Sequence, residues 1–132
     1  MDPNILLAML LFSETKDIED AKGIANVVIN RMKRPERFGS TLEEVIYKPS
    51  QFSGVNSTEW KKTETGEMTD KEKDIFKQFI AISSAANKGA LEDNTKGADH
   101  YVNLKIAKPK FSKVYPKTAQ LGEHTYFVEP VK

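Results

Sequence analysis

The sequence contains no cysteine, which excludes disulfide bonds and thiolate metal sites. It also lacks an excess of one charge, because 20 basic residues face 19 acidic ones and the formal net charge is +1. A chain so close to neutrality has no overall attraction to nucleic acid or to an anionic membrane. The apolar run at residues 5–12 is far shorter than the roughly 20 residues that a membrane-spanning helix needs. We therefore expect no nucleic-acid partner and no membrane insertion.

The features of a secretory signal are also missing. Met1 and Asp2 provide no basic segment before the apolar run, and no small-x-small cleavage site follows it. We therefore expect synthesis in the cytoplasm without a signal peptide. The length of 132 residues and the 39% of hydrophobic residues suffice for one buried core, which predicts a single domain over residues 1–132, present as a monomer.

One segment departs from the even distribution of charge. Residues 105–117 contain five lysines and no acid, at Lys105, Lys108, Lys110, Lys113 and Lys117. Such a run is typical of a solvated loop. The alternative is a patch that meets an anionic polymer, of which nucleic acid is one example, although the near-zero net charge argues against nucleic acid.

The N-terminal third predicts two helices. Asp2 followed by Pro3 is a typical helix start, and the first helix should run from Pro3 to about Ser13. Its apolar residues leave almost no polar face, which predicts a central, buried helix. Asp17 caps a second, amphipathic helix that extends to about Lys33.

The middle of the chain predicts two further helices, and the C-terminal end predicts strands. Capping boxes at Thr41 and Thr69 open a short helix to Tyr47 and a long amphipathic helix that closes at Gly89. A polar loop is expected between Gln51 and Met68. The aromatic segments at 98–103 and 124–130 are partly alternating and predict strands, with the lysine-rich loop between them. The expected fold class is α+β, mostly helical, with a small β part near the C-terminus.

Glu14 is the candidate catalytic residue. It ends the buried helix, where the partial negative charge of the helix terminus disfavours a carboxylate. Burial disfavours the anion further, and both effects raise the pKa of a carboxyl group. A glutamate that stays protonated near neutral pH suits general acid catalysis, of which glycosidic bond cleavage is the usual example. The alternative is that Glu14 caps the next helix or lies in solvent.

Other titratable residues allow further hypotheses. His100 and His124 fall short of the three protein ligands of a typical catalytic zinc, and no His-Glu-x-x-His spacing exists, so we expect no metal. His124 is expected to bond backbone near the C-terminal strand. Asp93 and Asp99 are possible second carboxylates at about 6.5–9.5 Å from Glu14, as an inverting glycosidase requires. Asp93 also fits an Asx turn.

Four segments together resemble the SleB-type cell wall hydrolase family, which includes spore cortex-lytic enzymes and phage proteins. These segments are residues 12–32, 45–53, 93–103 and 121–127. They carry Glu14 at the end of the first helix, Asn30-Arg31 at the end of the second, Gln51-Phe52 after a proline, and a Gly-x-His-x-Tyr ending at Tyr126. The resemblance covers most of the chain in the right order.

The resemblance implies a lysozyme-like fold that acts on peptidoglycan without metal or cofactor. It implies cleavage between N-acetylmuramic acid and N-acetylglucosamine by a lytic transglycosylase with Glu14 as general acid and base. Gln51 would bind a sugar acetamido group. Tyr101 and Asn103 share a face of an extended segment, which would bring Tyr101 to Glu14 and Asn103 to a sugar. Asn30 and Arg31 are expected to be structural, and Phe52 to belong to the core.

Two alternatives remain open at the level of sequence. One is an inverting muramidase that uses water, and the other is a non-catalytic glycan-binding module of a virion. The family resemblance and the missing signal peptide together favour a phage protein, either an endolysin or a virion-associated protein acting at the bacterial cell wall. Its partners would then include other virion or lysis proteins.

Overall fold

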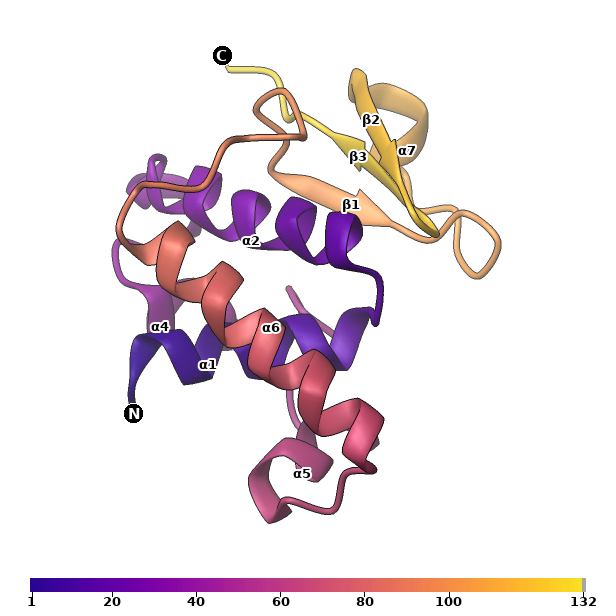
Figure 1. Ribbon diagram of the computed structural model, residues 1–132. Coiled ribbons are helices and arrows are strands. Elements are labelled where there is room, and N and C mark those ends of the chain that lie inside the picture. Colours follow the sequence, from indigo (N-terminus) through magenta and orange to yellow (C-terminus); the bar gives the residue numbers. More distant parts are fainter. Residues whose placement is uncertain (132) are drawn as a thin grey trace.

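The computed structural model describes residues 1–131 and has the expected α+β class (Figure 1). The helices are α1 (Pro3–Glu14), α2 (Ile18–Met32), α3 (Pro35–Phe38), α4 (Leu42–Tyr47), α5 (Thr58–Thr65), α6 (Asp70–Asn87) and α7 (Phe111–Val114). The strands are β1 (His100–Val102), β2 (Lys117–Leu121) and β3 (His124–Phe127). Figure 1 shows α2 between the small sheet and the helices α1 and α6. None of the described helices combines the length and apolarity that crossing a membrane requires.

Helix α1 is the central, buried helix that the sequence predicts. The Asp2 side chain accepts a hydrogen bond from the Asn4 backbone at 2.7 Å, and Pro3 occupies the first turn. Residues 6–12 are all buried, so the helix has no solvent-facing side over most of its length. Helices α2, α4, α5 and α6 all contact it, which explains why a helix without a polar face is stable here.

The predicted helix starts are confirmed, with one difference in detail. Asp17 caps α2, and Thr69 forms a complete capping box with Glu72 at the start of α6. Thr41 caps α4 through the Glu44 backbone N–H at 3.1 Å. The return bond of that capping box is absent, because the Glu44 carboxylate accepts from the Ser40 backbone at 2.9 Å instead.

The predicted polar loop from Gln51 to Met68 is wrong in part, because it contains α5. Ser57 caps this helix and Gly66 ends it in the left-handed conformation, with φ of 78°. Trp60 is the only buried residue of α5, so the segment has no periodic apolar pattern from which to predict a helix. The single-turn helices α3 and α7 and the strand β2 were also not expected from the sequence. The two helices are too short to show a periodic pattern, and no residue of β2 is fully buried.

The sheet is antiparallel with the order β1-β3-β2. The two predicted strands β1 and β3 pair directly, with Tyr101 opposite Tyr126. All four residues of β3 are buried, and β1 and β2 both contact α2. Gly23 of α2 permits this approach, because a Cβ atom there would lie 2.5 Å from the Tyr126 hydroxyl.

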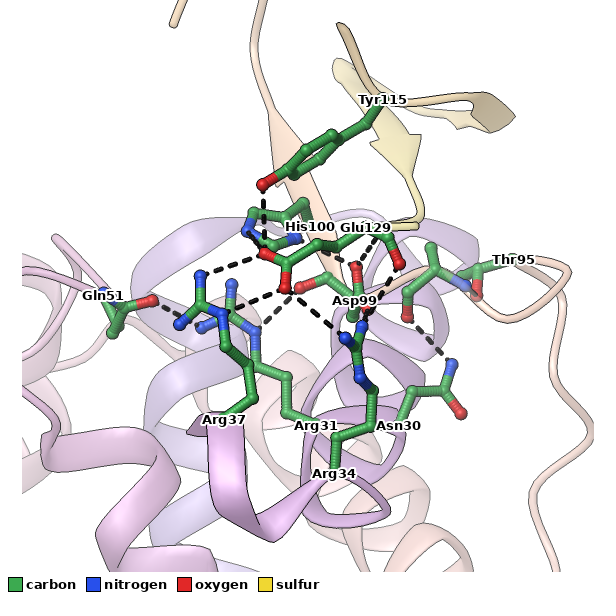
Figure 2. A network of polar contacts seen from close by, with 11 residues as sticks. Asn30, Arg31, Arg34, Arg37, Gln51, Thr95, Asp99, His100, Tyr115 and Glu129 are labelled. Carbon is green, nitrogen blue, oxygen red and sulfur yellow. Dashed lines mark hydrogen bonds and ion pairs between the residues drawn. The ribbon is translucent and has the colours of Figure 1, made fainter. Parts of the chain in front are cut away.

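A polar network ties the C-terminal segment to α2 and α3 (Figure 2). Glu129 accepts hydrogen bonds from Arg37 at 3.0 Å and from the Tyr115 hydroxyl at 3.0 Å. The Asp99 carboxylate joins Arg34 at 2.9 Å and the Glu129 backbone N–H at 2.8 Å. These contacts tie residue 129 to α3 and to Asp99, and the Arg31 side chain of α2 holds the Asp99 carbonyl just before β1.

We expect Trp60→Ala to lower the free energy of unfolding by about 3–5 kcal/mol, the usual cost of truncating a large buried aromatic side chain. Trp60 is 2% exposed. Its edge-on neighbour Tyr47, at 6.2 Å between ring centroids, is 47% exposed and provides the matched control. Tyr47→Ala should cost no more than about 1.5 kcal/mol. Urea denaturation measures both, and equal costs would contradict an anchoring role for Trp60.

Candidate active site

Glu14 lines a cleft with a volume of about 360 Å³. The cleft is lined by the end of α1, by residues 51–53, by β1 with the segment that follows it, and by the turn between β2 and β3. Gln51, Tyr101 and Asn103 also line it. The structure therefore brings together all four site residues predicted from the sequence, although they come from three distant parts of the chain.

The Glu14 carboxylate is held by one backbone group. The Gly54 N–H donates a hydrogen bond to Glu14 Oε1 at 2.9 Å. A Cβ atom at Gly54 would lie 2.6 Å from the same oxygen and would also overlap Ser13. Only glycine allows the loop after Phe52 to come this close, so Gly54 positions the carboxylate.

The pKa of Glu14 is raised above its usual value, as the sequence predicts. Burial is the largest cause, since it disfavours the charged form. The Gly54 hydrogen bond, the charge of His124 and the Tyr101 hydroxyl lower the pKa, and the charge of Asp20 raises it. Burial prevails, and Glu14 is therefore suited to hold a proton at a pH where an exposed glutamate has lost its own.

Tyr101 forms one wall of the cleft beside Glu14. Its ring stacks on Phe52, with 6.2 Å between centroids, and meets the His124 ring edge-on at 5.1 Å. Phe52 is 8% exposed, in agreement with its expected core role. Burial and the charge of Glu14 raise the pKa of Tyr101 well above its usual value, so the hydroxyl keeps its proton and can donate a hydrogen bond.

Arg31 positions Gln51, which also lines the cleft. Its guanidinium lies between the rings of Phe38 and Phe52, at 4.8 and 4.7 Å from their centroids. It donates to the Asp99 carbonyl at 2.8 Å and to Gln51 Oε1 at 3.2 Å (Figure 2). These contacts agree with the expected structural role of Arg31, and its side chain also lines the cleft. Since its oxygen is taken, Gln51 can offer its amide N–H groups to a ligand.

Asn103 is arranged in a similar way. Its Oδ1 accepts a hydrogen bond from the Lys105 backbone at 2.9 Å, which fixes the side chain at the rim of the cleft. Its amide nitrogen donates to no atom of residues 1–131, so it too can offer N–H groups to a ligand. Ile106 and Ala107 continue the same wall.

The expectation that His124 bonds backbone is wrong, because its Nδ1 lies 2.6 Å from Oδ2 of Asp20. Asp20 is 1% exposed, and its Oδ1 accepts from the Tyr126 hydroxyl at 2.6 Å. Sequence reasoning missed Asp20, although it recognised His124 and Tyr126 as one motif. The available signal was an acid on the buried face of a helix that is otherwise apolar on that side.

The two aspartates considered as second carboxylates do not line the cleft. Asp93 forms the predicted Asx turn, accepting from the Thr95 backbone at 2.8 Å and the Gly97 backbone at 3.0 Å. Asp99 belongs to the network of Figure 2. The cleft contains a different second carboxylate, Glu123, in the turn before β3, which the sequence did not single out.

The remaining candidates lie outside the site. His100 bonds Asp99 at 2.9 Å, and no group of three metal-ligating side chains occurs in residues 1–131. Asn30 bonds Asp93 at 3.1 Å and the Ala98 carbonyl at 2.9 Å, as expected for a structural residue. The five lysines of residues 105–117 are all exposed, which agrees with a solvated segment and leaves the binding of an anionic polymer a prediction.

Both the sequence and the fold of this chain are similar to those of known proteins. A family model described as Cell Wall Hydrolase matches residues 16–127. The catalytic domain of the germination-specific lytic transglycosylase SleB from Bacillus anthracis aligns with 96% of this chain and 95% of its own, at 21% identity and a TM-score of 0.69. The catalytic domain of the Bacillus cereus SleB protein aligns with 96% and 91%, at 21% identity and a TM-score of 0.64. No match is found among curated proteins. The structural likeness confirms the expected fold.

The raised pKa of Glu14 makes a prediction about stability. A carboxyl group with a raised pKa binds its proton more tightly in the folded than in the unfolded chain, so stability falls as pH rises from the unfolded to the folded value. Glu14→Gln keeps an oxygen for the Gly54 N–H and cannot ionise. We expect equal stabilities at pH 4, and at pH 8 a gain for the variant of about 1.4 kcal/mol per unit of raised pKa.

Urea denaturation at the two pH values measures this difference. The exposed residue Glu64 provides the matched control, since Glu64→Gln removes a carboxylate that is already solvated. A Glu14→Gln variant that is less stable than wild type at pH 8 would show that the buried carboxylate stabilises the fold as an anion.

Proposed function

Because the chain belongs to the cell wall hydrolase family, we propose that it cleaves the glycan strands of peptidoglycan, with Glu14 as general acid and base. The observation that carries this proposal is the environment of Glu14. Its pKa is raised by burial, its carboxylate is held by the Gly54 N–H, and it lines a cleft together with the hydrogen-bond donors Gln51, Tyr101 and Asn103. A protonated, positioned glutamate supplies what departure of a glycosidic oxygen requires.

In the first step Glu14 acts as acid. Its proton goes to the glycosidic oxygen between N-acetylmuramic acid and N-acetylglucosamine, while the bond from that oxygen to C1 of the muramic acid breaks. Positive charge develops on the sugar, and the substrate's own 2-acetamido group stabilises it. The carboxylate that remains keeps its hydrogen bond from Gly54, which limits the cost of ionisation inside the cleft.

In the second step the Glu14 carboxylate acts as base. It takes the proton of the C6 hydroxyl of the same muramic acid, while the C6 oxygen bonds to C1. The product is a 1,6-anhydro sugar, no water is consumed, and Glu14 is again protonated. The description of the Bacillus anthracis relative as a lytic transglycosylase supports this outcome.

The donors on the cleft walls are proposed to bind the sugar. Gln51 is held by Arg31 and Asn103 by the Lys105 backbone, so both present amide N–H groups in fixed positions. Acetamido carbonyls and hydroxyls of the glycan are matching acceptors. The Tyr101 hydroxyl beside Glu14 is proposed to orient the carboxyl group or the reacting sugar.

A hydrolytic reaction is the second candidate, and Glu123 favours it. Glu123 is the other carboxylate that lines the cleft, whereas Asp93 and Asp99 are occupied elsewhere. An inverting muramidase would use Glu123 as base toward a water molecule. The two reactions differ in product, because hydrolysis leaves a reducing end.

The first test is mass spectrometry of the soluble products from purified peptidoglycan. We expect wild type to release fragments that are one water lighter than reducing muropeptides. Glu14→Gln should release none, because its amide cannot donate the proton. Reducing ends would assign the hydrolytic reaction, and Glu123→Gln would then test the proposed base. Glycan binding without release by a folded wild-type protein would contradict the enzymatic proposal and support a binding module.

The second test concerns the sugar contacts. We expect Gln51→Ala and Asn103→Ala each to lower kcat/KM about 10-fold, the equivalent of one hydrogen bond to substrate. Gln78→Ala, on the exposed side of α6, is the control and should leave kcat/KM unchanged. Thermal denaturation of all three variants shows whether the fold is intact. Wild-type kcat/KM for either cleft variant would remove that residue from the proposed binding set.

A further inference from the structure

We propose that His124, held by Asp20, carries a positive charge beside Glu14 and stabilises the Glu14 carboxylate while its proton is on the substrate. This inference rests on the function proposed for Glu14. It assigns a positioning role to the Asp20–His124 pair, a buried pair of titratable groups that the two catalytic steps do not otherwise use.

Both carboxylate oxygens of Asp20 have a hydrogen-bond partner. Its Oδ2 faces His124 Nδ1 at 2.6 Å, and its Oδ1 accepts from the Tyr126 hydroxyl at 2.6 Å. Both Asp20 and His124 are at most 9% exposed. A buried carboxylate with both oxygens bonded is fixed in place, and it favours the protonated, cationic form of the imidazole that it holds.

His124 reaches the same cleft as Glu14. Both residues line it, and the His124 ring packs edge-on against Tyr101, whose hydroxyl neighbours Glu14. Burial lowers the pKa of His124, but the hydrogen bond and charge of Asp20, followed by the charges of Glu14 and Glu123, outweigh burial and raise it. The charge of His124 in turn lowers the pKa of Glu14.

Among the charged groups that shift the pKa of Glu14, His124 is the cation. Glu14 acts on it from α1, Asp20 from α2 and Glu123 from the adjacent turn. The Tyr101 ring of β1 meets it edge-on, and the Tyr126 hydroxyl of β3 bonds its partner Asp20. Arg31 also lines the cleft, where its guanidinium bonds Gln51 and the Asp99 carbonyl. Its charge is among those that act on Tyr101 and is not among those that shift the pKa of Glu14.

The pair therefore resolves a conflict of charge. Asp20 alone would place a second buried anion near Glu14 and oppose its ionisation. The positive charge of His124 compensates the negative charge of Asp20 and attracts the carboxylate that forms on Glu14. Proton donation to the substrate is thus made easier, at the cost of a lower pKa for the acid.

Reciprocal coupling gives a test that needs no activity. If His124 stabilises the Glu14 anion, the Glu14 anion raises the pKa of His124 by the same free energy. We would titrate both histidines by NMR in wild type and in Glu14→Gln. The expected result is a fall in the His124 pKa of about half a unit or more in the variant. His100, which bonds Asp99 in the separate network of Figure 2, is the internal control and should not change.

The pH profile of kcat/KM tests the consequence for catalysis. His124→Asn keeps an N–H group for Asp20 and removes the charge. We expect its alkaline limb to move to higher pH by about half a unit or more, with a lower maximal rate. The double variant Asp20→Asn/His124→Asn removes both charges, and its limb should move less than that of the single variant.

The outcomes separate the two proposals. Identical His124 titrations in wild type and Glu14→Gln would overturn the inference, whether or not the protein cleaves peptidoglycan. Identical alkaline limbs in wild type and a folded His124→Asn would also overturn it. If the titrations differ but wild type releases no fragments, the electrostatic pair stands and the proposed function fails. The NMR titration uses only Glu14→Gln, so it decides the matter even if the His124 variants do not fold.

Discussion

The burial of α1 is the constraint on which the rest of the structure depends. This helix has no polar face over residues 6–12, so it is stable only when other elements cover it on every side. Helices α2, α4, α5 and α6 do so, and α1 leaves the buried interior only at its two ends. Glu14 is the only ionisable side chain of the helix, and it appears where the packed interior meets the cleft. The buried helix thus ends in Glu14, the carboxyl group on whose position the proposed reaction depends.

The close approach of the sheet to α2 provides the second wall of the site. Gly23 leaves room for the Tyr126 ring, and one turn earlier Asp20 receives the Tyr126 hydroxyl. The same strand carries His124 to Asp20, and its partner β1 carries Tyr101 to the cleft. The network around Glu129 ties the residues just after β3 to Arg37 and Tyr115, and this helps to hold in place the short strands that carry side chains near Glu14.

Much of this arrangement was predictable from the sequence, and the exceptions have physical reasons. Caps and periodicity predicted α1, α2, α4 and α6, and the family resemblance, now confirmed, brought Gln51, Tyr101 and Asn103 to one site. Helix α5 was missed because its only buried side chain is Trp60. Asp20 and Glu123 were missed for a different reason. Their importance depends on how β3 lies against α2, and no local pattern encodes that register.

The environment of Glu14 is a balance between groups that act in opposite directions. Burial alone would hold the proton so tightly that the carboxyl group would be a poor acid. The Gly54 N–H and the positive charge of His124 act against burial, and Asp20 acts with it. Each of these groups reaches Glu14 from a different part of the chain, so the fold as a whole sets the proton affinity of one carboxyl group. A residue that must first release one proton and then take up another needs a proton affinity between these extremes, which neither a solvated glutamate nor a fully desolvated one provides.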